Sequence, residues 1–252
     1  MIDTKWLLGI RFDRIDAEQA LAMMRERTPD ASFAYVVTLN ADHMIRLDRA
    51  GRELHAVYQS AWLSLCDSRV LCLLAARQNI QLSLAAGSDL TQLLFDCAIE
   101  PHTPVTIIGS TVEAVDLLRA RFGLQRLFQQ IPPMGFIHDP NAVADTVRFV
   151  RNHPAHYVFL CVGSPQQEIL AAAIAADGNA SGIGLCVGAA IDFVTGIKRR
   201  APIWVQRAHV EWLHRLCREP GRLWRRYIFG IPRLLVLMHH VPRDGSARQR
   251  SV

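Results

Sequence analysis

The stretch HYVFLCVGSPQQEILAAAIAADGNASGIGLCV, residues 156–187, decides the fold class. It contains two short apolar runs, 156–163 and 182–187, and between them a segment with helical periodicity at 165–176. Apolar strands that alternate with helices are typical of a parallel sheet whose two faces are both covered. The stretch therefore predicts an α/β protein.

The same alternation occurs along most of the chain. Further buried strands are expected at 34–39, 62–66 and 105–109. Amphipathic helices are expected at 41–60, 68–77, 88–98, 111–122 and 140–152. The pattern predicts one mostly parallel sheet with helices on both faces.

Charge divides the chain into two parts. Residues 198–252 carry 13 Lys or Arg against 3 Asp or Glu, whereas the preceding residues carry 15 against 20. With 252 residues, half of them apolar, the chain can bury one substantial core. We expect an α/β core at 1–197, a basic amphipathic appendage at 198–241 and a disordered tail at 242–252. Such asymmetry favours an anionic partner: nucleic acid, a phosphorylated substrate or a lipid surface.

Several protein classes do not fit. The six cysteines lie in apolar runs without CxxC spacing, which favours reduced thiols in a cytosolic protein. The N-terminus lacks the form of a signal peptide, and the apolar segment 227–241 is too short to span a membrane and is interrupted by Pro232 and Arg233. Gly182, Gly184 and Gly188 do not have the spacing of a dinucleotide fingerprint and lie largely within a strand.

Small and polar residues follow the predicted strands. Ligands of open α/β sheets bind beyond the carboxyl ends of the strands, where helix N-termini present unpaired N–H groups. The residues expected at this edge are Thr38, Asn40, Asp67, Ser68, Gly109, Ser110, Gly163, Ser164, Gln167 and Gly188. Their chemistry indicates a site for phosphate and sugar groups.

Helix capping is an alternative explanation for several of these residues. Ser164 with Gln167, and Ser110 with Glu113, have the spacing of a capping box. Asp67 and Asn40 could each cap the helix that follows. Capping and ligand binding are compatible, because a capped helix still has free N–H groups.

The appendage combines arginines with aromatic residues. Two short helical segments are expected at 211–218 and 222–229, separated by Pro220 and Gly221. Basic amphipathic helices of this composition bind at membrane interfaces. A nucleic-acid-binding module that uses Arg for phosphates and Trp or Tyr for stacking is the alternative. Pull-down by anionic liposomes or by single-stranded nucleic acid, across a salt series, distinguishes the two.

A series of motifs, in order from about residue 34 to 229, resembles the WecG/TagA/CpsF glycosyltransferase family. The motifs are TLNADH at Thr38, Asp67 after a strand, GSDL at Gly87, GSPQQE at Gly163, VGAAIDFVTGIKRRAP at Val187 and EWLHRLCREPGRLWRRY at Glu211. The resemblance implies a Rossmann-like fold with a C-terminal appendage that docks on the membrane and helps to complete the active site.

The resemblance also implies inverting transfer of a sugar from a UDP-sugar to a polyprenyl-diphosphate-linked saccharide at the cytoplasmic face of the bacterial inner membrane. Asp67 falls on the family's catalytic aspartate and would act as the base, with Thr38, Asn40 and Gln167 orienting the reactants. Residues expected to bind substrate are Gly109, Ser110, Gly163, Ser164, Gly188, Asp192, Arg215, Arg222 and Arg225. The arginines would neutralise the departing diphosphate, so no metal or other cofactor is expected.

Two positions depart from the family pattern. Ser68 stands where Gly commonly follows the catalytic aspartate, and Leu84 stands where an arginine is usual. The sequence does not identify the sugar, and a soluble nucleotide-sugar enzyme without a lipid acceptor is a further alternative. An apolar helix face left uncovered by the tail would favour a homo-oligomer.

Overall fold

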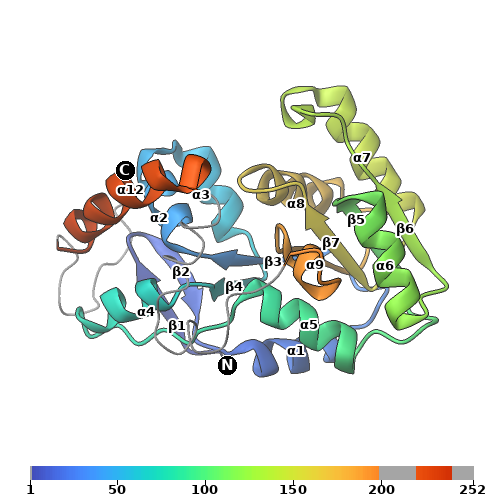
Figure 1. The fold of residues 1–252 in the computed structure, drawn as a ribbon, viewed down its shortest axis with the longest axis horizontal. Helices are drawn as coiled ribbons and strands as arrows, with labels where there is room; N and C mark the ends of the chain where they lie inside the picture. Colours follow the sequence, from blue (N-terminus) through green and yellow to red (C-terminus); the bar gives the residue numbers. More distant parts are fainter. Residues whose placement is uncertain (1, 199–219, 240–252) are drawn as a thin grey trace.

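The computed structural model describes residues 2–198 and 220–239. Its centre is a six-stranded, all-parallel sheet in the order β4-β3-β8-β7-β5-β6 (Figure 1). The strands are β3 (Ala34–Leu39), β4 (Leu63–Cys66), β5 (Val105–Gly109), β6 (Leu127–Gln130), β7 (Tyr157–Cys161) and β8 (Ile183–Cys186). The expected parallel sheet is confirmed, and β6 is a strand that the sequence pattern did not predict.

Helices cover both faces of this sheet. One face carries α2 (Ala41–Arg49), α3 (Arg52–Gln59), α4 (Arg69–Ala76), α7 (Pro140–Asn152), α8 (Gln166–Asp177) and α12 (Pro220–His239), with the short 3-10 helix η1 (Phe136–His138). The other carries α1 (Ala17–Glu26), α5 (Gly87–Cys97), α6 (Val112–Phe122) and α9 (Ala190–Val194). Neighbouring strand residues face opposite cores: Val37 belongs to the first cluster and Val36 to the second.

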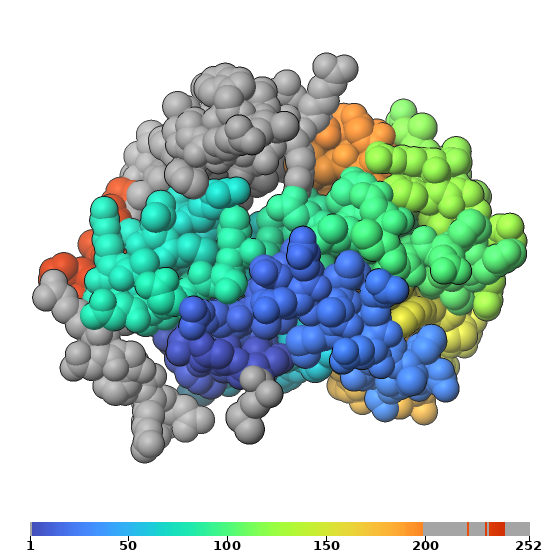
Figure 2. All heavy atoms as spheres, turned by 90° about the horizontal axis from the view of Figure 1, so that it is seen from below, coloured from blue at the N-terminus to red at the C-terminus, as the bar shows by residue number. Residues whose placement is uncertain are grey.

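An antiparallel hairpin, β1 (Thr4–Leu7) and β2 (Ile10–Asp13), precedes the sheet and was not predicted. Its anchor is Asp13, which is buried and accepts a 2.8 Å hydrogen bond from the backbone N–H of Ser64 in β4. Figure 2 shows this hairpin and α1 on one face of the molecule, beside α4 and α5. Strands of four residues carry too little periodicity to be recognised from sequence alone.

The helix expected at 41–60 is two helices. The extended backbone of Ala50 ends α2, and Gly51 begins α3. A break at Gly costs little, because Gly has a low helix propensity. The apolar periodicity of the sequence continues across the break, because α2 and α3 both pack against the same core cluster. Leu47 of α2 and Tyr58 of α3 are buried in it.

The C-terminal helix α12 packs on α2 and α4 (Figure 1). Leu234 and Met238 are buried in the first core cluster, and Arg233 forms an ion pair with Asp48 of α2. The helix continues through Pro232, although the segment 222–229 was expected to be a short separate helix. The other expected segment, 211–218, lies outside the described residues. Within the described ranges, none of the helices is both long and apolar enough to cross a membrane.

The contacts of α12 also fix its direction. Gly230 lies against Ile45, with an added Cβ only 3.0 Å from Ile45 Cδ1, and Arg233 meets Asp48 one turn further along both helices. Both pairs have the same sequence offset, so α12 and α2 run in the same direction. The N-terminal half of α12 is therefore directed toward the end of α2 at which Asn40 lies.

Candidate active site

The polar residues predicted for the site gather at one edge of the sheet. Because the six strands are parallel, their carboxyl ends share this edge. The predicted residues that follow a strand end here are Asn40 after β3, Asp67 after β4, Ser110 after β5, Gly163 and Ser164 after β7, and Gly188 after β8. Thr38 is the second-last residue of β3 and Gly109 is the last residue of β5. Gln167 and Asp192 lie on α8 and α9.

Asp67 stands directly between β4 and α4. Its backbone N–H donates a 2.7 Å hydrogen bond to the carbonyl of Leu39, which places Asp67 beside the end of β3. The helix cap is Ser68, whose hydroxyl accepts from the N–H of Leu71 at 3.2 Å. Asp67 is therefore not the N-cap, and the Ser68 departure from the family pattern supplies the cap instead.

Leu84 lies next to this position. It forms an isolated parallel bridge with Cys66, and the following residue, Ala85, donates its N–H to the Cys66 carbonyl at 2.8 Å. The chain then enters α5 at Gly87, where a Cβ would lie 2.9 Å from Thr38 Oγ1. Glycine at the start of the GSDL motif thus lets α5 approach Thr38 closely. Leu84 introduces an apolar side chain at a position where the family commonly has a cation.

Asn40 caps α2, as expected. Its Oδ1 accepts hydrogen bonds from the N–H groups of Asp42 and His43, at 3.0 and 3.4 Å. In return, the Asn40 N–H donates to His43 Nδ1 at 3.2 Å, which completes a capping box. Because Nδ1 accepts this bond, the hydrogen-bond network assigns the ring proton of His43 to Nε2.

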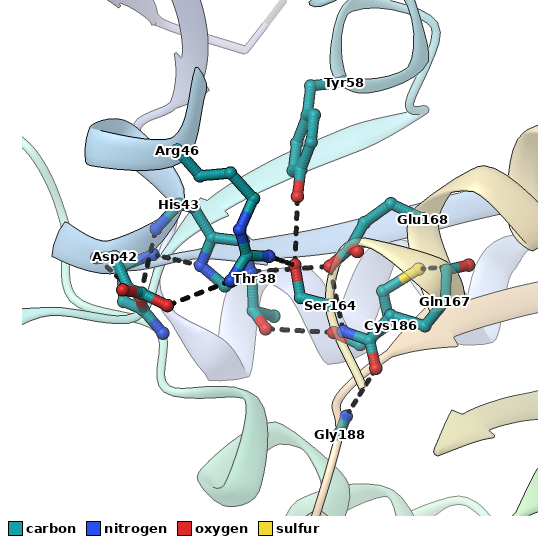
Figure 3. Close-up of polar contacts among 11 residues, drawn as sticks. Thr38, Asp42, His43, Arg46, Tyr58, Ser164, Gln167, Glu168, Cys186 and Gly188 are labelled. Carbon is teal, nitrogen blue, oxygen red and sulfur yellow. Dashed lines mark hydrogen bonds and ion pairs between the residues drawn. The ribbon is translucent and has the colours of Figure 1, made fainter. Parts of the chain in front are cut away.

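That Nε2–H faces a buried carboxylate. Glu168, in the first turn of α8, is only 1% exposed, and its Oε1 lies 3.4 Å from His43 Nε2 (Figure 3). The separation is longer than a typical direct hydrogen bond, so the contact is mainly electrostatic. Burial by itself would raise the pKa of Glu168. The contacts with His43 and Gln167 and its own backbone N–H outweigh burial and hold the pKa below its usual 4.5.

Gln167 extends this network to β8. Its Nε2 donates to Glu168 Oε1 at 2.9 Å, and its Oε1 accepts from the backbone N–H of Gly188 at 3.0 Å (Figure 3). Gly188 has a φ of +57°, a conformation that glycine adopts readily. A buried polar chain thus joins the end of β3, the start of α8 and the turn after β8. In this structure the Gln167 amide contacts protein groups on both sides and is only 4% exposed.

A second set of polar side chains surrounds Ser164. Arg46 Nη1 donates to Ser164 Oγ at 2.8 Å, and Arg46 Nη2 pairs with Asp42 at 3.1 Å. The Tyr58 hydroxyl lies 3.3 Å from the same Ser164 oxygen (Figure 3). Burial, with a smaller effect of Glu168, raises the pKa of Tyr58, so its hydroxyl stays protonated. Ser164 does not cap α8: the N-cap is Pro165, without a side-chain hydrogen bond.

The end of β5 has an unusual backbone. Gly109 and Ser110 both have positive φ, +89° and +61°, and the helix cap is Thr111 rather than Ser110. The Ser110 hydroxyl is shielded from solvent and has no hydrogen-bond partner within the described part of the chain. A buried hydroxyl without a hydrogen-bond partner is energetically unfavourable, so a hydrogen bond from a bound substrate to Ser110 would be stabilising.

Of the remaining predicted residues, Thr38 and Asp192 contact other protein groups, and the tail arginines have side chains outside the described part of the chain. Thr38 is buried, and its hydroxyl donates to the Cys186 carbonyl at 3.1 Å. Asp192 forms a 2.7 Å ion pair with Lys198. Arg215 lies outside the described residues. The backbone of α12 carries positions 222 and 225, but the side chains of Arg222 and Arg225 are also outside the described part.

Sequence reasoning missed the residues that hold the site together. His43, Arg46, Tyr58 and Glu168 were not singled out, although His43 ends the quoted TLNADH motif and Glu168 ends GSPQQE. Their position in those motifs was the available signal. No group of three or more His, Cys, Asp or Glu side chains within residues 2–198 and 220–239 is arranged to hold a metal ion.

Comparison with protein families gives the context for this geometry. The family model described as "Glycosyl transferase WecG/TagA/CpsF family" matches residues 5–247, nearly the whole chain.

The chain belongs to the WecG/TagA/CpsF glycosyltransferase family.

Membership makes this protein a glycosyltransferase of cell-surface polysaccharide synthesis, which acts on a nucleotide-sugar donor and an acceptor. The match begins at residue 5, one residue into the β1–β2 hairpin, and it ends beyond α12. In this family member, the strand ends described above form the candidate active site. The interpretation as a nucleic-acid-binding module is thereby set aside in favour of an enzyme.

Proposed function

We propose that this protein is an inverting glycosyltransferase that moves a sugar from a UDP-sugar to a polyprenyl-diphosphate-linked saccharide. The observation that carries the proposal is the position of Asp67 at the end of β3. Its backbone N–H donates a hydrogen bond to the carbonyl of Leu39, the residue before Asn40. A carboxylate at the carboxyl edge of a parallel sheet, next to capped helix N-termini, suits proton transfer beside a bound diphosphate.

In the proposed reaction Asp67 takes the proton from the acceptor hydroxyl. The hydroxyl oxygen attacks the anomeric carbon from the side opposite the UDP, and the bond to the diphosphate oxygen breaks. The configuration inverts, and negative charge develops on the departing UDP. Asn40 would orient the reacting hydroxyls. Gln167 and Glu168 would act indirectly, by fixing the Gly188 turn through the contacts described above.

The growing charge on UDP calls for cations near Asp67. Arg46 is engaged by Ser164 and Asp42, and Leu84 replaces the usual arginine. The direction of α12 supports the tail arginines in this role, because its N-terminal half is directed toward the Asn40 end of α2. Planar guanidinium groups at Arg222 and Arg225 suit diphosphate oxygens.

We further propose that the enzyme acts at the cytoplasmic face of the bacterial inner membrane as a peripheral protein. The support is the charge of the chain beyond residue 197, which has 13 basic against 3 acidic side chains. An acceptor on a polyprenyl diphosphate would present its sugar at this interface.

A donor screen tests the proposal. Purified full-length protein is incubated with individual UDP-sugars and a lipid-diphosphate saccharide, and UDP release and glycolipid product are measured. We expect one donor to support turnover and Asp67→Asn to reduce kcat by roughly 10²–10⁴-fold, the usual contribution of a general base. Asp116→Asn, on the exposed surface of α6, is the matched control and should retain activity.

Turnover by Asp67→Asn equal to that of the unmutated enzyme would remove Asp67 as the base. Failure of every UDP-sugar and lipid acceptor would refute the proposed substrates. Transfer to a water-soluble saccharide with the same efficiency would favour the alternative enzyme without a lipid acceptor.

Truncation of the appendage does not test this alternative cleanly. Leu234 and Met238 belong to the first core cluster, so deletion of α12 would expose apolar core as well as remove the arginines. Charge-removing substitutions Arg222→Gln and Arg225→Gln keep the helix, because Gln and Arg have similar helix propensities. Activity of both variants equal to wild type would contradict a role in binding the diphosphate.

A further inference from the structure

Two thiols face one another beside Asp67. The Sγ atoms of Cys66, at the end of β4, and Cys72, on α4, are 3.5 Å apart. Cys66 is buried and Cys72 is half-buried. The proposed function gives neither thiol a role. Asp67 and Ser68 are the first two residues of the short segment that joins the pair.

The two cysteines lie on different elements, and hydrogen bonds hold the backbone of each. Cys66 is paired with Leu39 in the sheet, and its carbonyl accepts the N–H of Ala85 at 2.8 Å. Cys72 is the fourth residue of α4, and its N–H donates to the carbonyl of the Ser68 cap at 3.0 Å. Closure of the pair therefore links α4 covalently to the end of β4, through rotation of the two side chains or a shift of α4.

The pair is also chemically asymmetric. The hydrogen bond with Cys66, helped by the positive charge of Arg69, lowers the pKa of the Cys72 thiol. The same hydrogen bond, together with burial, raises the pKa of Cys66. Cys72 is thus the more readily ionised and the more accessible sulfur, as an attacking thiol requires, and the sulfur of Cys66, 3.5 Å away, is close enough to resolve the oxidised product.

We propose that Cys66 and Cys72 are a modification site that closes to a reversible disulfide when the protein meets a peroxide. The Cys72 thiolate attacks one peroxide oxygen, the O–O bond breaks and hydroxide leaves, which gives a sulfenic acid on Cys72. The Cys66 sulfur then attacks the Cys72 sulfur, and the sulfenic oxygen leaves as water. Two thiols lose two electrons and two protons, and hydrogen peroxide is reduced to two molecules of water.

Closure changes the surroundings of Asp67. A disulfide bond is about 2.05 Å long, so the two sulfurs must approach by roughly 1.5 Å from their present separation. Rotation of the two side chains and a shift of α4 can both supply this approach, and any shift of α4 carries the Asp67–Ser68 segment with it. We expect the oxidised enzyme to lose at least about tenfold in turnover, since small misplacements of a catalytic group are costly. This consequence rests on the proposed function; the disulfide itself does not.

Tryptic mapping tests the modification site. Full-length protein is treated with hydrogen peroxide, its remaining thiols are blocked with iodoacetamide under denaturing conditions, and it is digested with trypsin. Cleavage after Arg52, Arg69 and Arg77 separates the pair into peptides 53–69 and 70–77. We expect these peptides to appear joined, about 2 Da lighter than their summed masses, and to separate on reduction with dithiothreitol.

Matched variants locate the reaction. Cys72→Ser should abolish the joined peptide, whereas Cys97→Ser, at an exposed cysteine of α5, should leave it unchanged. Recovery of both Cys66 and Cys72 as alkylated single peptides, with oxidation confined to Cys97, would overturn the proposal. Cys66→Ala provides a second variant without the joined peptide if Cys72→Ser fails to fold.

Turnover measured on the same samples tests the effect on the active site. Peroxide should lower the turnover of the unmutated enzyme, dithiothreitol should restore it, and Cys72→Ser should be insensitive. A joined peptide with unchanged turnover would overturn the effect on Asp67. Absence of turnover with every substrate before oxidation would count against the proposed function alone, because the peptide map is read without activity.

Discussion

His43 Nε2 lies 3.4 Å from Oε1 of Glu168, and this contact joins the helix after β3 to the helix after β7. The imidazole accepts the Asn40 N–H on its other nitrogen, and the carboxylate accepts from Gln167, which in turn holds Gly188. Two ends of the candidate site are therefore coupled through buried side chains. In a low-dielectric interior such a network is strong when complete and costly when broken.

The charge of Glu168 should make the stability of this protein pH-dependent. Its folded pKa lies below the usual 4.5, so the unfolded chain takes up this proton first as the pH falls. The stabilisation by the carboxylate is complete above pH 4.5 and is lost as the pH falls through the folded pKa. Glu168→Gln should therefore lower the free energy of unfolding by about 1–2 kcal/mol at pH 7 and show a smaller loss in acid.

Urea unfolding of the two proteins between pH 7 and about pH 3 measures this difference. Glu113→Gln, on the exposed first turn of α6, is the control and should follow the unmutated curve. Curves for Glu168→Gln and wild type that stay parallel down to the lowest pH would show that Glu168 is not the group responsible.

Substitutions at His43 separate its two contacts. His43→Gln keeps an N–H donor directed toward Glu168 but loses the acceptor for the Asn40 N–H, whereas His43→Ala loses both. We expect His43→Ala to cost about 1–3 kcal/mol, since it leaves a buried carboxylate with one partner fewer, and His43→Gln to cost less. Thermal or urea unfolding gives the order. His55→Ala, on the surface of α3, should change stability by less than about 0.5 kcal/mol. Equal losses for the two His43 variants would argue against a contribution from Glu168.

A glycine pair tests whether the turn after β8 matters for catalysis. Gly188 and Gly178 both have positive φ, +57° and +71°, and neither has an atom within 3.4 Å of an added Cβ. Each change to Ala should therefore destabilise the fold by about 1–2 kcal/mol. Only Gly188→Ala should also reduce kcat, because its N–H is held by Gln167 at the site. If the Gly178→Ala enzyme, altered at the far end of α8, loses as much turnover, the effect is one of stability alone.

Adjacent leucines test the docking of α12. Leu234 is fully buried, whereas Leu235 is 45% exposed. Leu234→Ala should lower the free energy of unfolding by about 2–5 kcal/mol through the cavity and the lost apolar contact. Leu235→Ala should lower it by less than about 0.5 kcal/mol. Chemical unfolding monitored by tryptophan fluorescence provides the measurement, and similar values for both variants would contradict the packing of α12 on α2.

Much of the fold could be predicted because its signals are local. The bounds of β3, β5 and α7 coincide with those expected from apolar runs and helical periodicity. The hairpin, β6 and the break at Gly51 were missed, since short or half-exposed elements leave little pattern. The alternative that Ser164, Ser110 and Asp67 cap helices was wrong for a related reason: capping residue types recur at strand ends, and only the backbone conformation shows which one begins the helix.

The candidate site was predicted in part. Motifs located Asp67, Asn40 and the strand ends, because these residues follow recognisable apolar runs. They did not show that Gln167 binds Glu168 and Gly188, nor that Arg46 reaches Ser164, 118 residues away in sequence. Such pairs depend on which strands are neighbours.

The sequence by itself determined the class of fold, the polar character of one sheet edge and the basic end of the chain. Each follows from residue type and spacing within a few turns or strands. Only the tertiary structure decided the pairing of His43 with Glu168, the approach of Cys66 to Cys72 and the direction of α12 along α2. These contacts depend on strand order and helix packing, which are set by burial of the whole core and not by any one segment.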